Sequence, residues 1–152
     1  MRLEYFEMLD RIVEMNKVSK SIVVESTVPL ESPVFEGHFP GFPIVPGVLL
    51  SEVMGQACGV LSMECEGSDL MGVLASMNKT KYRQFVQPGD ALLTFASIEH
   101  FGSGFTVCNA KIKKGKICVA NSEIRISLIP FPNEVTKFAV NANRKRLLTV
   151  EL

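Results

Sequence analysis

The chain has 152 residues, a length that suits one domain better than two. Hydrophobic residues make up 47% and charged residues 21%, which excludes disorder as the dominant state and provides material for a core. The 16 basic and 16 acidic side chains give a net charge of zero, so the composition argues against a nucleic-acid partner and is compatible with a homo-oligomer.

The hydropathy pattern argues against membrane insertion and against export. The most apolar stretch, residues 44–61, is interrupted by Pro46, Glu52 and Gln56. The N-terminus carries Glu4 and Glu7 and lacks the basic and apolar regions of a signal peptide. Mean hydropathy is nevertheless slightly positive, at +0.22. We therefore expect a cytoplasmic protein whose surplus apolar surface forms a subunit interface or lines a ligand pocket.

The cysteines suit packing better than chemistry. They are Cys58, Cys65, Cys108 and Cys118. None stands in a C-x-x-C pair, and the chain has only two histidines, so a zinc site lacks well-spaced ligands. We expect reduced thiols and no metal, with a redox or nucleophilic role as the minority alternative.

The first part of the chain predicts a helix, a strand and a rigid loop. Residues 3–15 place apolar side chains at helical spacing and predict an amphipathic helix. Residues 18–29 are rich in β-branched residues and predict a strand. Three prolines and three glycines in EGHFPGFPIVPG, residues 36–47, indicate an ordered, stiff loop and exclude helix and central strand.

Residues 47–64 predict a helix that is buried all round. They are apolar on nearly every side, a pattern typical of a helix with no face toward water. Gly55 and Gly59, one turn apart, weaken the helix intrinsically. We expect another backbone to pack closely against them.

Antiparallel strands separated by turns are predicted after this helix. We place the strands at residues 70–77, 78–86, 90–100, 105–113 and 116–128. One buried helix followed by antiparallel strands predicts an α+β domain at residues 1–129, in which the sheet wraps around the helix. Residues 130–152 form a separate tail with a helix near 134–142 and no assigned function.

Glu52 is the first candidate for chemistry. A carboxyl group in an otherwise apolar helix is expensive to bury unless it is paired. Gln56 stands one turn further along the same helix face, where its amide can orient the carboxyl group. A buried carboxyl group keeps its proton more readily, as a general acid requires. The alternative is that Ser51 and Glu52 only mark an exposed stripe of the helix.

His38 and Gly47 are the other candidates. His38 lies in the stiff loop, which would hold an imidazole in place as a base, although a lone loop histidine is more often solvated. Gly47 starts the buried helix, where unpaired N–H groups could receive an oxygen that develops negative charge. We assign no role to His100, which stands at a strand end.

Five motifs together resemble the active-site signature of a known family. They are GHFPG at residues 37–41, IVPGVL at 44–49, Glu52 with Gln56-Ala57, KYRQFV at 81–86 and PGD at 88–90. This signature resembles that of the β-hydroxyacyl-carrier-protein dehydratases, which are hot dog fold enzymes of fatty acid synthesis. The likeness extends over residues 20–128.

The resemblance implies a role for each matching residue. His38 would be the catalytic base, held by the carbonyl group of Ile44. Glu52 would be the acid that assists departure of the β-hydroxyl group, with Gln56 as its support. The amide of Gly47 would receive the thioester oxygen. The implied substrate-binding residues are Ile44, Gly47, Val48 and Gln56.

The resemblance also implies the reaction and the partners. A (3R)-3-hydroxyacyl thioester would lose water to give a trans-2-enoyl thioester, without a cofactor or metal, on an acyl carrier protein or on coenzyme A. The chain would form a homodimer with shared active sites, and three such dimers could assemble. Phe42 and Ser51 depart from the family pattern, which leaves the acyl chain length and the pathway open.

Three cations predict a docking surface for the carrier. Lys79, Lys81 and Arg83 alternate along one strand and so share a face, which would attract an acidic carrier protein. The alternative is that they are edge-strand charges that prevent aggregation. Docking at residues 144–146, which are also basic, is a further alternative.

Two other classes of protein remain open. A hot dog thioesterase, or a protein that only binds acyl thioesters, would share the fold but would not need this loop. A purely structural subunit would show no activity and no loss on changing His38.

Overall fold

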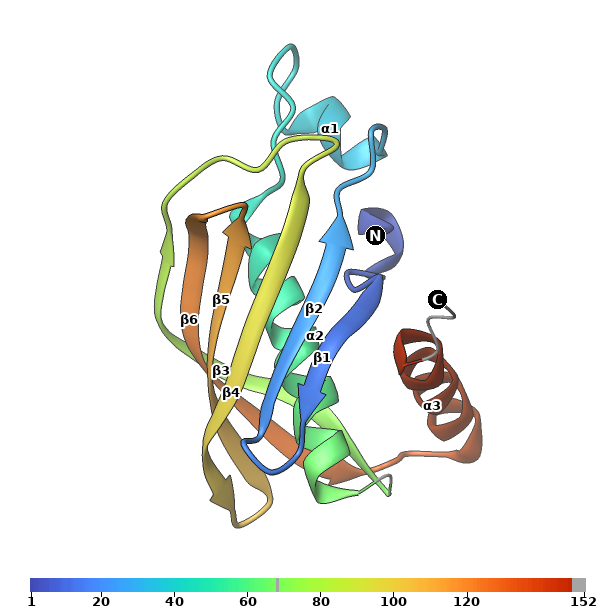
Figure 1. Ribbon diagram of the computed structural model, residues 1–152. Helices are drawn as coiled ribbons and strands as arrows, with labels where there is room; N and C mark the ends of the chain where they lie inside the picture. The colour runs from blue at the N-terminus through green and yellow to red at the C-terminus, as the bar shows by residue number, and fades with distance from the viewer. Residues whose placement is uncertain (68, 149–152) are drawn as a thin grey trace.

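The computed structural model describes residues 1–67 and 69–148 (Figure 1). In chain order the elements are η1 (Leu3–Tyr5), β1 (Arg11–Asn16), β2 (Ser21–Thr27), α1 (Pro33–Gly37), α2 (Gly47–Glu66), β3 (Leu70–Tyr82), β4 (Ala91–Gly102), β5 (Phe105–Lys114), β6 (Ile117–Pro130) and α3 (Glu134–Leu148). The six strands form one sheet in the order β1-β2-β4-β5-β6-β3, in which all neighbours are antiparallel. Figure 1 shows this sheet curving around α2, so the predicted α+β hot dog fold is confirmed.

The core lies between α2 and the inner face of the sheet. Val53, Met54, Ala57 and Cys58 of α2 are fully buried, as are alternate residues of the strands facing them. By length and composition α2 could cross a membrane, yet most of it is covered by the sheet. Its apolar surface is therefore accounted for by the core of this domain.

Close packing of α2 against β3 depends on two glycines. A Cβ at Gly72 of β3 would lie 3.3 Å from the α-carbon of Gly59 in α2, tighter than most side-chain contacts in proteins. The expectation of a closely packed backbone is therefore confirmed for Gly59. It is wrong for Gly55, where the nearest atoms to an added Cβ belong to the Leu74 side chain, at 3.8 Å.

The predicted helix at residues 3–15 is wrong. Only η1 is helical there, and it ends at Phe6, whose positive φ of 55° breaks the turn. Residues 11–16 instead form β1, which pairs with β2. Apolar side chains recur in this short segment in a way that suits either structure, and pairing with the sheet decides between them.

Three boundaries also differ from the prediction. The strands expected at 70–77 and 78–86 are the single strand β3, which contains irregularities near residues 75 and 79–80 and is followed by a loop at 83–90. Residues 33–37 form the short helix α1, so the stiff loop begins only after it. In the tail, α3 continues to Leu148, six residues beyond the predicted end.

Helix α3 lies beside β1 at one edge of the sheet (Figure 1). Leu147 is completely buried and belongs to the same core as Leu3 and Leu9. Arg144 of α3 forms an ion pair with Glu64 of α2, at 2.9 Å, where both side chains are nearly buried. Thus α3 packs on the domain through apolar and ionic contacts. Residues 149–152 of the predicted tail lie outside the described residues.

Candidate active site

His38 follows α1 and is held by the loop that it begins. The carbonyl oxygen of Ile44 lies 3.1 Å from Nδ1, and the N–H of Ile44 donates to the carbonyl oxygen of His38 at 3.0 Å. Because a carbonyl group only accepts, Nδ1 carries the hydrogen, and in the neutral ring Nε2 is left with a free lone pair. The imidazole also stacks on Phe39, with ring centroids 4.1 Å apart. This geometry suits a base that accepts a proton at Nε2.

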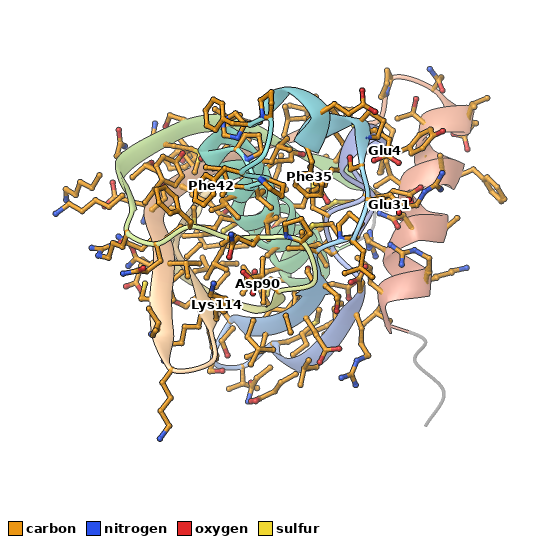
Figure 2. All side chains as sticks on the ribbon, turned by 90° about the horizontal axis from the view of Figure 1, so that it is seen from above. Glu4, Glu31, Phe35, Phe42, Asp90 and Lys114 are labelled. Carbon is orange, nitrogen blue, oxygen red and sulfur yellow. The ribbon has the colours of Figure 1, made fainter. Side chains whose placement is uncertain are left out.

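The loop after His38 is fixed by the chain that follows β3. The N–H of Val45 donates to the carbonyl oxygen of Val86 at 2.7 Å, and Phe42 packs edge-on against Phe85. Lys114 in turn donates to the carbonyl oxygen of Phe85 and to Asp90, at 3.1 and 2.9 Å. Figure 2 looks down on this end of the molecule, with Asp90 next to Lys114. The two loops therefore support each other.

Gly47 begins α2 directly after this loop. Among the described residues neither its N–H nor that of Val48 has a hydrogen-bond acceptor, and no side chain caps the helix. The ring of Tyr82 lies against Gly47, because a Cβ there would be 3.3 Å from three ring carbons. The Tyr82 hydroxyl group is 2.5 Å from that of Ser51. The helix start thus offers free donors beside an aromatic wall.

Glu52 stands one turn into α2 and is partly buried. Nε2 of Gln56 donates to its Oε1 at 2.8 Å, the contact expected from their spacing. Gln56 is itself held by the N-terminal segment (residues 1–10). Its Nε2 donates to the carbonyl oxygen of Phe6 at 2.6 Å, and its Oε1 accepts from the N–H of Met8 at 3.3 Å. The carboxyl group of Glu52 is therefore oriented by a fixed amide.

The side chains of His38 and Glu52 are not hydrogen-bonded to each other in the described part of one chain. Among residues 1–67 and 69–148, the imidazole of His38 has Ile44 as its hydrogen-bond partner, and the carboxyl group of Glu52 has Gln56. Large apolar side chains around them face solvent, including Val48, which is 71% exposed, and Phe85, which is 63% exposed. One chain thus presents the two halves of a candidate site beside an uncovered apolar surface.

The three predicted docking cations lie near a different surface. Lys79 has a positive φ of 52° at an irregularity of β3 and pairs with Glu123 at 3.8 Å, while Arg83 hydrogen-bonds Asn121. Lys79 and Arg83 line a hollow of about 960 Å³ on the face of the sheet opposite α2, which His38 and Glu52 do not line. Lys81 is exposed and does not line this hollow.

The described residues contain no group of three His, Cys, Asp or Glu side chains placed to hold a metal ion. The four cysteines are free thiols, and two of them are fully buried. Cys58 and Cys108 interact through their thiols, and this contact, together with burial, raises the pKa of Cys58 well above its ordinary value. A buried thiol with a raised pKa is rarely ionised, which argues against a nucleophilic role for Cys58.

Two sets of contacts could not be predicted from the sequence: that of Tyr82 with Gly47, and those of Gln56 with the N-terminal segment. Tyr82 is far from Gly47 in the chain, and only a glycine at a helix start, where other residues favour helix better, hints at a close neighbour. The support of Gln56 by Phe6 and Met8 joins segments almost fifty residues apart, in a region expected to be helical. His100, which had no assigned role, lies in β4, and its ring centroid is 5.5 Å from that of Phe105.

Comparisons with known proteins identify the family of the chain. Residues 2–123 match the FabA-like domain family. The chain is 34% identical over 125 residues to the 3-hydroxyacyl-[acyl-carrier-protein] dehydratase FabZ of Alkalilimnicola ehrlichii, covering 80% of each chain. It is 38% identical over 132 residues to the protein of the same name from Nitratiruptor sp., covering 82% of this chain and 88% of that one.

A solved structure shares the fold at much lower identity. It is a variant of the thioesterase SAV0944 from Staphylococcus aureus, which matches with a TM-score of 0.65 at 19% identity, over 84% of this chain and 98% of that one. At this identity the likeness concerns the fold alone. The match over residues 2–123, together with the two dehydratase relatives, shows that the chain belongs to the FabA-like domain family.

Proposed function

We propose that this protein is a dehydratase that converts (3R)-3-hydroxyacyl thioesters to trans-2-enoyl thioesters in the synthesis of fatty acids or related lipids. Its FabZ relatives are named as 3-hydroxyacyl-[acyl-carrier-protein] dehydratases. The observation that carries the proposal is that the chain holds both an imidazole and a carboxyl group in orientations that suit acid–base catalysis. An imidazole is fixed with Nε2 free, and a carboxyl group is oriented by an amide.

The reaction needs a base and an acid of opposite protonation state. Neutral His38 removes the proton from the α-carbon at Nε2, because its Nδ1 hydrogen is held by Ile44. Glu52, in its protonated form, gives its proton to the β-hydroxyl group as the carbon–oxygen bond breaks, and water leaves. At the end of the reaction His38 holds the proton taken from the α-carbon and Glu52 has lost its proton to the departing water. Proton exchange with solvent then restores both groups.

The thioester oxygen gains negative charge as the α-proton leaves. The N–H group of Gly47, which has no acceptor among the described residues, would receive this oxygen at the positive end of α2. Ile44 and Val48 would line the substrate beside it, and Gln56 would hold the acid. In this proposal His38 would be the base, Glu52 the acid and Gly47 the oxyanion donor that the chemistry requires.

The proposed active site is shared between two copies of the chain. No hydrogen bond joins His38 to Glu52 in the described part of one chain, and large apolar side chains such as Val48 and Phe85 are exposed. Strand β3 is an edge of the sheet, since no strand of the described residues pairs with its outer side, and Val73 and Leu74 there are 39% and 42% exposed. A homodimer formed along this edge would place His38 of one copy against Glu52 of the other. Analytical ultracentrifugation separates this dimer from a trimer of dimers.

The substrate would be carried by an acyl carrier protein, as the names of the relatives state, with coenzyme A as the alternative carrier. Lys79, Lys81 and Arg83 are our candidates for docking an acidic carrier protein. The free thiols fit a reducing compartment, which supports a cytoplasmic location.

Thioester hydrolysis is the second candidate, because a thioesterase shares the fold. One assay separates the two functions. The purified protein is given a trans-2-enoyl thioester, and loss of the enoyl absorbance is followed together with release of free thiol. Hydration without thiol release supports the dehydratase, since the reaction is reversible. Thiol release without hydration would show a thioesterase, and neither signal would indicate a binding protein or structural subunit.

A further inference from the structure

Helix α3 contacts the segment that holds Gln56. We propose that Arg146 of α3 is a positioning residue for Glu52, which acts through the N-terminal segment and Gln56. Helix α3 lies beyond the residues that match the family, so this device belongs to the additional C-terminal part of the chain. The inference rests on the acid role proposed for Glu52, and its test includes a measurement that does not depend on that role.

Both polar atoms of the Gln56 amide are engaged in hydrogen bonds. Its Nε2 donates to Glu52 and to the carbonyl oxygen of Phe6, while its Oε1 accepts from the N–H of Met8. Turning the amide over would set its oxygen against the carbonyl oxygen of Phe6, acceptor against acceptor, and its NH2 group against the N–H of Met8, donor against donor. The orientation of the group that faces Glu52 is therefore fixed by the position of residues 6–8.

Residues 6–8 must themselves be held in place by other contacts. They lie outside regular helix or strand, so they lack the repeated hydrogen bonds of such elements. The carbonyl oxygen of Met8 accepts from the buried hydroxyl group of Ser26 at 2.7 Å. Two residues later, Asp10 accepts from the N–H of Thr27 at 2.6 Å and pairs with the N-terminal amine. This anchors the segment against β2 on one side.

Arg146 anchors the other side. Its guanidinium group donates to the carbonyl oxygens of Leu9 and Asp10, at 3.0 and 3.4 Å. Oδ1 of Asn143 accepts from Nε of Arg146 at 3.1 Å and from Nη2, the nitrogen that also donates to Leu9, at 2.9 Å. These two contacts orient the guanidinium group toward the backbone of the N-terminal segment. The rigid fork of arginine suits two adjacent carbonyl groups, whereas lysine offers a single point of charge.

Helix α3 is itself firmly placed. The neighbouring Leu147 is fully buried, and Arg144 pairs with Glu64 of α2. Arg146 therefore acts from a fixed support, and its contacts reach residues one and two positions from Met8. Loss of these contacts would loosen the N-terminal segment and let the Gln56 amide depart from Glu52. The binding of the substrate would not change.

The test compares Arg146→Ala with Lys137→Ala. Lys137 is on the same helix but pairs with Asp69 at the surface, so its removal takes away a cation without touching the N-terminal segment. We expect Arg146→Ala to lower kcat for hydration roughly tenfold with little change in KM, because misplacing a reacting group affects the chemical step. Lys137→Ala should match the wild type, and Arg146→Lys should recover part of the loss. Unchanged kcat in folded Arg146→Ala would overturn the proposal.

A double-mutant cycle tests the route through Gln56. If Arg146 acts through this amide, Arg146→Ala should cause no further loss of kcat in a Gln56→Leu background. Equal losses in both backgrounds would overturn the route. Should Arg146→Ala not fold, Asn143→Ala, which only releases the guanidinium group, takes its place in both experiments.

Hydrogen exchange at the Met8 N–H tests the contact without any assay of activity. This N–H donates to Gln56, so Arg146→Ala should speed its exchange, while Lys137→Ala should not. Unchanged exchange would contradict the inference even if activity changed. If the wild type had no hydratase activity but exchange at Met8 rose, the proposed function would fail while the link from Arg146 to Gln56 stood.

Discussion

The ring of Tyr82 lies flat against the start of α2 at Gly47, where an added Cβ would be 3.3 Å from three ring carbons. This relationship joins the edge strand β3 to the helix end that would receive the thioester oxygen. It also explains why the first residue of α2 has no side chain, although alanine favours helix by about 1 kcal/mol over glycine.

We predict that Gly47→Ala lowers both activity and stability, because the added methyl group displaces the Tyr82 ring and the helix start. Overpacking of this kind costs about 1–3 kcal/mol. Tyr82→Leu should recover stability in the double variant, because leucine removes the ring carbons that the methyl group meets. Chemical denaturation measures both effects. Equal destabilisation with and without Tyr82 would show that the two residues do not compete for space.

The ion pairs of Glu64 predict a pH dependence of stability. Burial opposes ionisation of this carboxyl group, but the contacts with Lys17 and Arg144 outweigh it and hold its pKa below the ordinary value of 4.5. A pKa lowered by folding stabilises the protein above 4.5, and this contribution disappears as the pH falls through the lowered value. Glu64→Gln should therefore destabilise the protein at neutral pH and approach the wild type in acid. A constant difference in unfolding free energy across this range would contradict the assignment.

The sequence predicted the helix, the loop and the last strands because their patterns are local. The prolines around His38 and the apolar run of α2 identify the loop and the core helix without knowledge of any partner. The hydrogen bonds of His38 with Ile44 and of Glu52 with Gln56 also join near neighbours in the chain. Elements and contacts of this kind can be predicted from spacing.

The remaining features depend on distant partners. Residues 11–16 form a strand because β2 offers a pairing edge, although their own pattern suits helix as well. The contacts of Gln56 with Phe6 and Met8, and of Arg146 with Leu9, join the two ends of the chain to its middle. Such contacts cannot be predicted from the residue pattern within any one of these segments.

Mixing two inactive variants tests the shared site. His38→Ala and Glu52→Gln each remove one group, so a dimer with one copy of each variant would retain one intact site. Random pairing in a two-fold dimer should recover about a quarter of the wild-type activity. The control is the same mixture of separately purified proteins measured before subunits exchange. No recovery, with mixed dimers demonstrated by differential tags, would place the site within one chain.

Changing Lys79, Lys81 and Arg83 tests carrier docking. If Lys79, Lys81 and Arg83 bind an acidic carrier, converting all three to Glu should raise KM for a carrier-linked substrate and scarcely affect a short pantetheine thioester. The wild-type KM for the carrier-linked substrate should also rise with salt. Equal effects on both substrates would show that the row supports the fold or the pocket. No effect on either would move docking elsewhere, with residues 144–146 as the next basic group.

The central claim is that Glu52 supplies the proton that leaves with the hydroxyl group. The most direct measurement is the rate of enoyl thioester hydration by Glu52→Gln, which keeps the size of the side chain and its hydrogen-bonding contact with Gln56 but cannot serve as the acid. The account predicts a loss on the order of 10²–10⁴ in kcat, as for removal of a proton-transfer group, in a protein that is folded and dimeric. Near wild-type turnover by this variant would contradict the account.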